Sequence, residues 1–503
     1  NITTTGSGIG NRGIYLFTRV GGVNITNNLI NTSGTSSEHG IDLDTDVNNI
    51  LVLNNTINYG GSSSTNSGIR ATTRLFFNNF THNRITGKGG TSANYGIELA
   101  TNANASTIEY NNISTNGTTT TNYGITITSS TGNNITNNVI FTNGSSSNEG
   151  IRLATNSNNT IINSNNITTT GTAGSNFGIT LTSTVVANNV TNNIINTSGT
   201  ATNYGISLTT ESDNNTVDRN TITPGGSGAA NHGIYLLINS TNNNVTNNVV
   251  NASGSGTVYG IAVENITEAN SMNRFDSNNI SVSSAGSFGI LIRAANDTIF
   301  NNTYIRNVPN WTSSARGNNN NSFENTTFAN INGTINFRGT FQFNGTRAIT
   351  LALLNTTFNR SFVNSSNLTF LNTSATIRLY ITGLTNPRIL LDTEDDGSYR
   401  GCISSRCTLL QYASSVLTFN VSSWTSHAGA NNSAPTIIRV DINTTDPTTN
   451  NTNQNITAYP RNVTDTDADV VTNITNWFRN GNTITVLYMP FETNTNETAN
   501  NAT

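Results

Sequence analysis

The sequence predicts an all-β chain whose residues 1–305 form a right-handed parallel β-helix of about eleven coils, each 27–28 residues long. Two columns of residues predict this fold. The dipeptide Gly-Ile recurs at steps of 26–29 residues, and a unit of the form Asn-x-Ile/Val keeps the same period. A fixed period of roughly 20–50 residues is typical of solenoids. The glycines of the first column are Gly13, Gly40, Gly68, Gly96, Gly124, Gly150, Gly178, Gly205, Gly233, Gly260 and Gly289.

Each repeat predicts three short strands. In the first strand, as in Gly40-Ile41-Asp42-Leu43, the Ile and the Leu are two positions apart and point to the same face. The second strand centres on an apolar residue further along, such as Val190 or Val217, and the Asn-x-Ile/Val unit is the third. No segment between them is apolar enough for a helix of about ten residues. Parallel coils stack about 4.8 Å apart, so such a rod is roughly 50 Å long.

The asparagine columns have a predicted structural role. Asparagine tolerates left-handed backbone angles at a sharp corner, and its side chain can bond the equivalent asparagine one coil away. The column of the third strand is Asn28, Asn55, Asn83, Asn111, Asn138, Asn165, Asn193, Asn220, Asn248 and Asn278. A second column precedes the Gly-Ile corner, at Asn11, Asn66, Asn94, Asn122, Asn148, Asn176, Asn203 and Asn231. The following glycine predicts a tight turn.

These columns resemble the NosD-like and pectate-lyase-like β-helix superfamily, and the resemblance covers residues 1–305. It implies the fold. It does not fix the function, because such coils serve lyases, hydrolases, adhesins and surface fibres alike.

After residue 305 the period fails, and the sequence predicts smaller β modules. Residues 306–385 are interpreted as irregular terminal coils or a β-cap, which a solenoid needs to cover its last open edge. Residues 386–428 resemble the small β module that follows such coils in archaeal surface proteins. Residues 429–433 are interpreted as a linker, and residues 434–490 predict an immunoglobulin-like sandwich. The remainder, 491–503, is interpreted as a linker or the start of a truncated module.

Details of the last segments support this division. The strand candidates of the sandwich are Thr436–Ile442, Asn455–Tyr459 and Asn473–Phe478, and Trp477 is its expected core residue. Residues 486–492 resemble the first strand of laminin-G or concanavalin-like lectin modules. The chain also starts in mid-coil, because residues 1–6 repeat residues 166–171. We therefore expect a piece of a longer or processed protein.

Composition excludes several classes of function. The net charge of -4 and the single lysine, Lys88, give no basic surface for nucleic acid. No apolar run approaches the roughly 20 residues of a membrane span. Cys402 and Cys407 favour a small disulfide loop over half of a metal site. Together with roughly forty Asn-x-Ser/Thr sequons, which an Asn-rich and Thr-rich chain partly produces by chance, they favour an extracellular protein.

Candidate sites follow from these motifs. N-glycans are the expected covalent groups, and the acceptors singled out are Asn24, Asn31, Asn79, Asn116, Asn134, Asn143, Asn166, Asn196, Asn244, Asn251, Asn332, Asn344, Asn367, Asn420, Asn455 and Asn473. The loop at Asp465, Asp467 and Asp469 is a weak Ca²⁺ candidate and equally compatible with a solvated turn. No other cofactor is expected.

Charged residues occupy the outward positions of the first strand in several repeats. Asp42, Arg70, Glu98 and Arg152 lie at equivalent positions, and a stabilising charge ladder is favoured over an acid/base groove. An aromatic column precedes the glycine, and strand alternation places it inward, as core filler. It comprises Tyr95, Tyr123, Phe177, Tyr204, Tyr259 and Phe288. No Arg-Ile-Lys motif, paired catalytic aspartates or Ser-His-Asp set is found.

We therefore expect a non-catalytic structural glycoprotein of the cell surface, archaeal by resemblance. It would be a subunit of an extracellular filament, sheath, surface layer or adhesin that self-associates into a fibre or lattice. The alternative is a polysaccharide-binding or polysaccharide-cleaving β-helix, with extracellular polysaccharide as its partner. These two hypotheses differ in where ligand or neighbouring subunits would contact the rod.

Overall fold

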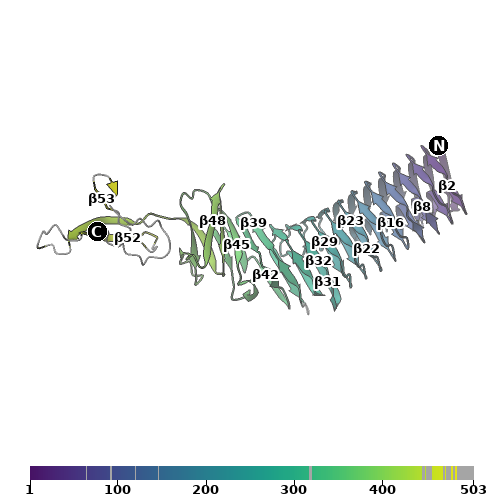
Figure 1. Ribbon diagram of the computed structural model, residues 1–503. Helices are drawn as coiled ribbons and strands as arrows, with labels where there is room; N and C mark the ends of the chain where they lie inside the picture. The colour runs from purple at the N-terminus through teal and green to yellow at the C-terminus, as the bar shows by residue number, and fades with distance from the viewer. Residues whose placement is uncertain are drawn as a thin grey trace.

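The computed structural model shows a long β rod at the N-terminal end of the chain, followed by antiparallel sheets (Figure 1). Its only helical element is the 3₁₀ turn Thr369–Leu371 in the described residues. The structure describes residues 1–444 apart from 64, 91–92, 119–120, 146 and 316–319, and then 448, 456–467, 471, 477–479 and 482–483.

Three parallel sheets form the faces of the rod, and each coil contributes one strand to each sheet. Sheet A consists of β1 (Ile2–Ile9), β4 (Leu29–Ser36), β7 (Thr56–Ser63), β11 (Arg84–Gly89), β15 (Asn112–Gly117), β18 (Val139–Gly144), β21 (Asn166–Gly171), β24 (Ile194–Gly199), β27 (Thr221–Pro224), β30 (Val249–Ala252), β33 (Asn279–Val282), β36 (Tyr304–Arg306) and β39 (Thr326–Asn330). Sheet B consists of β2 (Arg12–Phe17), β5 (His39–Asp44), β8 (Asn66–Thr72), β12 (Asn94–Ala100), β16 (Asn122–Thr128), β19 (Asn148–Ala154), β22 (Asn176–Thr182), β25 (Ile206–Thr209), β28 (Ile234–Leu237), β31 (Tyr259–Asn270), β34 (Phe288–Asn296) and β37 (Asn310–Ala315).

The third face, sheet C, is made of very short strands. It consists of β3 (Asn24–Thr26), β6 (Leu51–Leu53), β10 (Asn79–Thr81), β14 (Thr107–Glu109), β17 (Asn134–Thr136), β20 (Ile161–Asn163), β23 (Asn189–Thr191), β26 (Thr216–Asp218), β29 (Asn244–Thr246), β32 (Arg274–Asp276), β35 (Ile299–Asn301) and β38 (Ser322–Glu324). A two-residue pairing of β9 (Leu75–Phe76) with β13 (Ala103–Asn104) lies between sheets B and C along the chain. This arrangement confirms the predicted parallel β-helix.

The core of the rod is built from columns of aliphatic side chains. In sheet A, Ile85 pairs with Ile57 and Ile113 in the neighbouring coils, and all three are fully buried. Sheet B contributes an Ile and usually a Leu per coil, such as Ile41 and Leu43. Successive side chains of a strand point to opposite faces, so every second residue of each strand faces the core. The sequence has aliphatic residues at these positions.

The two predicted asparagine columns form continuous hydrogen-bonded ladders. Asn138 Nδ2 donates to Asn165 Oδ1 at 2.9 Å and to the carbonyl of Ile108 at 2.9 Å. In the second column, Asn122 Nδ2 donates to Asn148 Oδ1 at 3.0 Å. These amides pair buried corner groups that the short strands leave unbonded, because buried polar groups are costly without partners.

A third ladder, at the entry to sheet C, was missed by the sequence analysis. Asn188 Nδ2 donates to Asn215 Oδ1 at 2.9 Å, and Asn215 continues to Asn243 at 3.2 Å. Ser106 and Thr160 take the place of asparagine in other coils. The mixture of residue types hides this column from a search for one repeated letter.

One predicted role of asparagine was assigned to the wrong position. The left-handed residue at the corner before sheet A is the one that precedes the ladder asparagine, such as Asn137 with a φ of 55° before Asn138, or Tyr110 with a φ of 53° before Asn111. None of the described ladder asparagines has a positive φ. Their contribution is the side-chain bonding alone.

Parallel pairing continues past residue 305, through β37, β38 and β39, so the rod has one more coil than the predicted boundary implies. It ends where β40 (Gly333–Phe337) turns back antiparallel to β39. The strands that follow are β41 (Phe341–Gln342), β42 (Arg347–Thr350), β43 (Leu354–Thr357), β44 (Arg360–Val363), β45 (Ala375–Tyr380), β46 (Pro387–Asp392), β47 (Arg400–Gly401), β48 (Cys407–Ala413), β49 (Val416–Val421) and β50 (Ser426–Asn431).

These strands interleave segments that the sequence analysis separated. β45 pairs with β49, and β44 pairs with β50, so residues 333–431 form one antiparallel unit. Its apolar residues, such as Phe337 and Phe419, belong to the same core cluster as the coils. The unit therefore covers the last coil, as a solenoid cap must.

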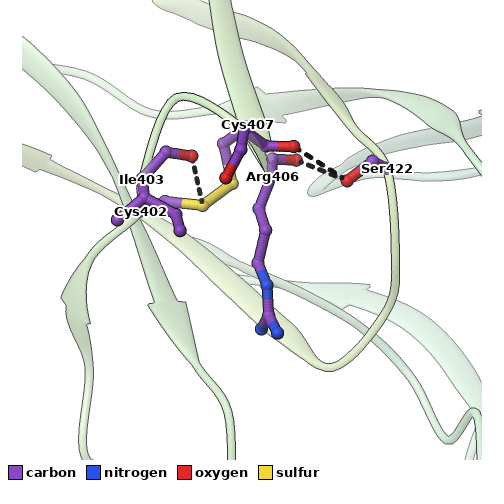
Figure 2. Close-up of a disulfide and its surroundings, with 6 residues drawn as sticks. Cys402, Ile403, Arg406, Cys407 and Ser422 are labelled. Atoms are coloured by element: carbon purple, nitrogen blue, oxygen red, sulfur yellow. Dashed lines mark hydrogen bonds between the residues drawn. A yellow bond between two sulfur atoms is a disulfide. The ribbon is translucent and has the colours of Figure 1, made fainter.

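The predicted disulfide is present. Cys402 and Cys407 are bonded across the turn that leads into β48, and the carbonyl oxygens of Ser405 and Arg406 in this turn accept hydrogen bonds from Ser422 Oγ (Figure 2). Beyond it, β51 (Thr436–Thr444) and β52 (Ile456–Thr464) form a two-stranded antiparallel sheet, and β53 (Phe478–Arg479) pairs with β54 (Asn482–Thr483).

An immunoglobulin-like sandwich is not established by this two-stranded sheet, and it remains a prediction. The expected strand at 473–478 lies outside the described residues except for its last two positions, and residues 491–503 lie outside them entirely. Among the described residues, no helix has the length and apolar character that crossing a membrane requires.

Candidate functional site

The charged side chains on the outer face of sheet B are engaged with one another. The Arg12 guanidinium contacts Asp42, whose carboxylate is fully buried, and Arg70 Nη1 lies 3.4 Å from the same carboxylate. Arg70 also lies 3.8 Å from Glu98, which accepts a hydrogen bond from Ser67. The predicted charge ladder is therefore confirmed, and a ligand groove lined by these side chains is not supported.

The aromatic column lies on the outside of sheet B, so its predicted inward placement is wrong. The strand pairings skip Gly96 and Gly124 but join Tyr95 to Tyr123. A Cβ at Gly96 would lie 2.2 Å from Ile113 Cγ2 in the core, so Gly96 and the buried Ile97 both face inward. The alternation of faces is broken there, and Tyr95 and Glu98 share the outer face. The Tyr95 and Tyr123 rings stack 5.3 Å apart, and neither belongs to the aliphatic core.

The rings of this column cover each other's faces. Phe177 stacks on Tyr204 with centroids 4.7 Å apart, and Tyr204 stacks on His232 at 5.0 Å. Their planes are nearly parallel, so mainly ring edges face solvent. The column therefore stabilises neighbouring coils and leaves little ring surface for a sugar.

Glu149 interrupts the aromatic column and is buried there. Burial raises its pKa to about 7, although the guanidinium of Arg152, 3.6 Å away, opposes the rise. The neighbouring Tyr123 has its pKa raised by the same burial. A carboxyl group that keeps its proton near neutral pH makes the stability of this part of the rod pH-dependent.

Glu149 is expected to lower stability progressively between pH 4.5 and pH 7. In that window the folded chain keeps a proton that the unfolded chain has released, so folding becomes less favourable as pH rises. Replacing Glu149 by Gln should remove this slope and stabilise the protein above pH 7. Melting temperatures of both proteins measured from pH 5 to 8 test this.

Two buried histidines also make the stability of the rod depend on pH, so their effect must be separated from that of Glu149. Burial lowers the pKa of His39 to about 3 and that of His232 to about 4, so these groups cost stability only as pH falls below 6.5. The difference between wild type and the Glu149→Gln variant isolates the carboxyl. Parallel pH profiles for the two proteins would contradict the assignment.

A hollow of about 500 Å³, lined mostly by polar residue types, lies on the outer face of sheet A, over the first four coils. Its lining residues are Thr3, Asn31, Thr32, Ser33, Thr56, Asn58, Tyr59, Gly60, Arg84, Thr86 and Lys88. A second hollow of about 480 Å³ adjoins it and shares Ser33, Gly60 and Lys88. Together they form a trough along the rod.

The trough coincides with a departure from the repeat. Most coils place Thr at the inward position two residues after the buried Ile, but β7 places Tyr59 there, and its ring occupies the space left by Gly87 in β11. At the next position Gly60 replaces the usual polar residue. A Cβ there would lie 2.1 Å from the carbonyl oxygen of Lys88, so only glycine fits at this position, which lines both hollows.

Two cations border the trough without a carboxylate partner. Arg84 and Lys88 are exposed on the same face of β11, four positions apart, with Thr86 midway between them in the alternating pattern. Among the described residues, neither forms an ion pair, unlike the arginines of sheet B. No sheet A strand from β1 to β36 contains Asp or Glu. The trough is therefore a cationic, hydroxyl-rich and amide-rich surface.

Lys88 is the only lysine of the chain, but the sequence alone does not place it in a site. Aligning the repeats would have helped, because residues 59–60 and 87–88 deviate together from the pattern of their column. The hollow itself depends on side-chain volumes across three coils, which a single sequence does not display.

The predicted N-glycan acceptors lie mostly at outward strand positions. Asn24, Asn116, Asn166, Asn196, Asn244 and Asn367 are exposed, and Asn31, Asn79, Asn134, Asn143, Asn251, Asn332, Asn344 and Asn420 are partly exposed. Asn344 also extends a buried ladder, since its Oδ1 accepts the amide of Asn321 at 3.0 Å. Asn455 and Asn473 lie outside the described residues.

The weak Ca²⁺ candidate gains no support from the described chain. Asp467 is paired with Arg388 at 3.0 Å and accepts the backbone amide of Ser433, while Asp469 lies outside the described residues. Within the described part of the chain, no group of three or more His, Cys, Asp or Glu side chains is arranged to hold a metal ion.

Several solved structures resemble this chain. The A-module of the mannuronan C-5 epimerase AlgE6 of Azotobacter vinelandii has 11% identity over 65% of this chain and 88% of its own length, with a TM-score of 0.36. The periplasmic alginate epimerase AlgG has 13% identity over 55% and 76%, with a TM-score of 0.29. No protein family profile and no curated protein matches the chain.

A phage protein resembles it over a larger share of the chain. The tailspike protein of E. coli bacteriophage HK620, solved in complex with a pentasaccharide, has 11% identity over 85% of this chain and 84% of its own length, with a TM-score of 0.38. At such TM-scores the likenesses transfer no substrate or reaction to this chain.

The expectation that the chain is not an enzyme is corrected by this comparison. It was an inference from missing motifs, and the structures that resemble the chain include alginate epimerases, which are enzymes. The lack of an Arg-Ile-Lys motif or paired aspartates therefore does not exclude catalysis in a chain of this kind.

Proposed function

We propose that this protein is an extracellular β-helix that binds an acidic polysaccharide in the trough of sheet A. The observation that carries the proposal is the pair of unpaired cations, Arg84 and Lys88, above a hollow lined mostly by polar residue types on a sheet face without carboxylates. Polysaccharide binding is the alternative function that the sequence suggested, but the proposed binding surface lies on sheet A instead of sheet B.

The chemistry of the trough suits a saccharide that carries carboxylates. Arginine and lysine form charge-assisted hydrogen bonds with carboxylates. The neighbouring hydroxyl and amide groups of Ser33, Asn58 and Thr86 can donate to and accept from sugar hydroxyls. An elongated trough along parallel coils accommodates several units of a chain rather than a single small molecule.

Removing both cations is expected to weaken binding of alginate oligosaccharides about tenfold, or ~1.4 kcal/mol. The double variant Arg84→Gln/Lys88→Gln removes both positive charges and keeps a polar, hydrogen-bonding group at each position, although the Gln side chains are shorter. Titration calorimetry of the full chain, produced without N-glycans, measures this, and wild-type affinity should fall with added salt.

A matched control removes two cations elsewhere. Arg19 and Arg338 are exposed and lie outside the trough, so Arg19→Gln/Arg338→Gln should bind as wild type does. Equal weakening in both double variants would mean that net charge, not the trough, governs binding. Absence of binding to alginate, dextran sulfate and neutral dextran alike would reject the proposed function.

We also propose a cell-surface location with N-glycans, which the disulfide and the exposed sequons support. Self-association of rods into a fibre or lattice, and an archaeal source, remain proposals that rest on the sequence resemblance.

A further inference from the structure

The sequons of the rod avoid its buried asparagines. None of the asparagines buried in the described chain is followed two residues later by Ser or Thr. In the ladder before sheet A the second residue after Asn is an inward Ile or Val, as in Asn138-Val139-Ile140, and before sheet B it is the corner glycine, as in Asn122-Tyr123-Gly124. The coil itself therefore excludes sequons from the ladders.

Outward asparagines are the acceptors, for a geometric reason. Residues two apart on a strand share a face, so an outward Asn has an outward residue at the second position, where Ser or Thr costs nothing. Sheet A shows this at Asn31-Thr32-Ser33 in β4 and at Asn196-Thr197-Ser198 in β24. The two tripeptides are identical, and both asparagines lie in the same outward row of the sheet.

Only one of these two acceptors borders the trough. Asn31 and Ser33 both line the main hollow, whereas Asn196 lies several coils away. The Nδ2 of Asn58 donates to Asn31 Oδ1 at 2.9 Å, which fixes the Asn31 carboxamide by its oxygen and leaves its nitrogen, the atom that carries an N-glycan, out of that bond.

The floor of the trough carries no acceptor. Asn58 occupies the same row one coil further, but Gly60 stands where its sequon would need Ser or Thr. Gly60 lines both hollows, and because it stands where Ser or Thr is needed it keeps an attached sugar off Asn58. The acceptor nearest in that row is then Asn31, at the rim.

We infer that Asn31 is a regulatory glycosylation site, where an attached N-glycan covers the trough and blocks its ligand. The inference rests on the proposed function of the trough. An N-linked glycan is bulky and hydrophilic, and at Asn31 it starts among the side chains that would contact the saccharide. The unglycosylated chain is the binding form, and the chain glycosylated at Asn31 is the closed form.

The test compares two acceptors in the full chain secreted from an N-glycosylating host. Asn112 and Asn116 neighbour Arg84 and Lys88, so both are first changed to Gln to leave Asn31 as the sequon of the trough. In this background, Asn31→Gln is compared with Asn196→Gln. Peptide mass mapping gives occupancy, and titration with alginate oligosaccharides gives affinity.

The expected result is an occupied Asn31 and at least tenfold weaker binding than the same background produced without N-glycans. The Asn31→Gln variant should bind with the same affinity whether it is produced with or without N-glycans, whereas the Asn196→Gln variant should keep the tenfold difference between the two preparations. An unoccupied Asn31, or equal affinity with and without its glycan, overturns the inference while leaving the proposed function intact. If the protein without N-glycans fails to bind at all, the proposed function is what fails.

Discussion

Replacing Gly124 by Ala is expected to destabilise the rod by about 3 kcal/mol or more. The new Cβ would lie 2.2 Å from Ile140 Cγ2 and 2.6 Å from the carbonyl oxygen of Gly150. The carbonyl is part of the stacked backbone and the Ile belongs to the packed core, so neither can move away without breaking the coil. Chemical denaturation followed by circular dichroism measures the loss.

The control for this substitution is Gly339→Ala. An added Cβ at Gly339 meets no atom within 4 Å, and no left-handed backbone is needed there. Its expected effect is within about 0.5 kcal/mol. If Gly124→Ala unfolds at the denaturant concentration of the wild type, the tight Gly-Ile corner is not how the coil turns.

Replacing Asn138 by Ala is expected to cost about 3–5 kcal/mol, because several buried groups lose partners at once. Asn138 Nδ2 donates to three acceptors, the Ile108 and Thr136 carbonyls and Asn165 Oδ1, while its oxygen accepts from the backbone and side-chain amides of Asn111. Each lost bond leaves a desolvated polar atom inside the corner.

The measurement for Asn138 should locate the damage as well as its size. In a solenoid each coil contacts mainly its neighbours, so amide hydrogen exchange should accelerate in residues near 108–165 before it does elsewhere. Asn166→Ala, at an exposed position on the next strand, should leave both stability and exchange unchanged. Uniform acceleration along the whole rod would argue against a local ladder.

The rod was predictable because its period fixes both the inward aliphatic columns and two of the three ladders. Ile85 and Asn111 each have equivalents in every neighbouring coil, so one sequence contains many copies of the same evidence. The third ladder was not found, since Ser106 and Thr160 replace asparagine within it. A column defined by hydrogen-bonding capacity rather than by one residue type would have shown it.

The errors arose where local geometry departs from strict alternation. Counting by two from Ile97 placed Tyr95 inside, but Gly96 and Ile97 both face the core, so Tyr95 lies outside. The cap was divided wrongly in sequence because β44 and β50 pair across more than sixty intervening residues. Long-range antiparallel pairing leaves no periodic signal, so only the folded chain reveals it.

The trough could not be predicted from the sequence for a similar reason. Its lining includes Tyr59, whose ring fills the space beside Gly87, and Gly60, where a Cβ would meet the backbone of Lys88. Each deviation is unremarkable alone. They lie together beside Arg84 and Lys88 only when the three coils are stacked in register.

A structure of the unglycosylated chain with a bound alginate tetrasaccharide would show whether the trough of sheet A holds an acidic saccharide. We expect sugar density over β4, β7 and β11, with a carboxylate within hydrogen-bonding distance of Arg84 or Lys88. Density over the outer face of sheet B, with the trough empty, would contradict this expectation.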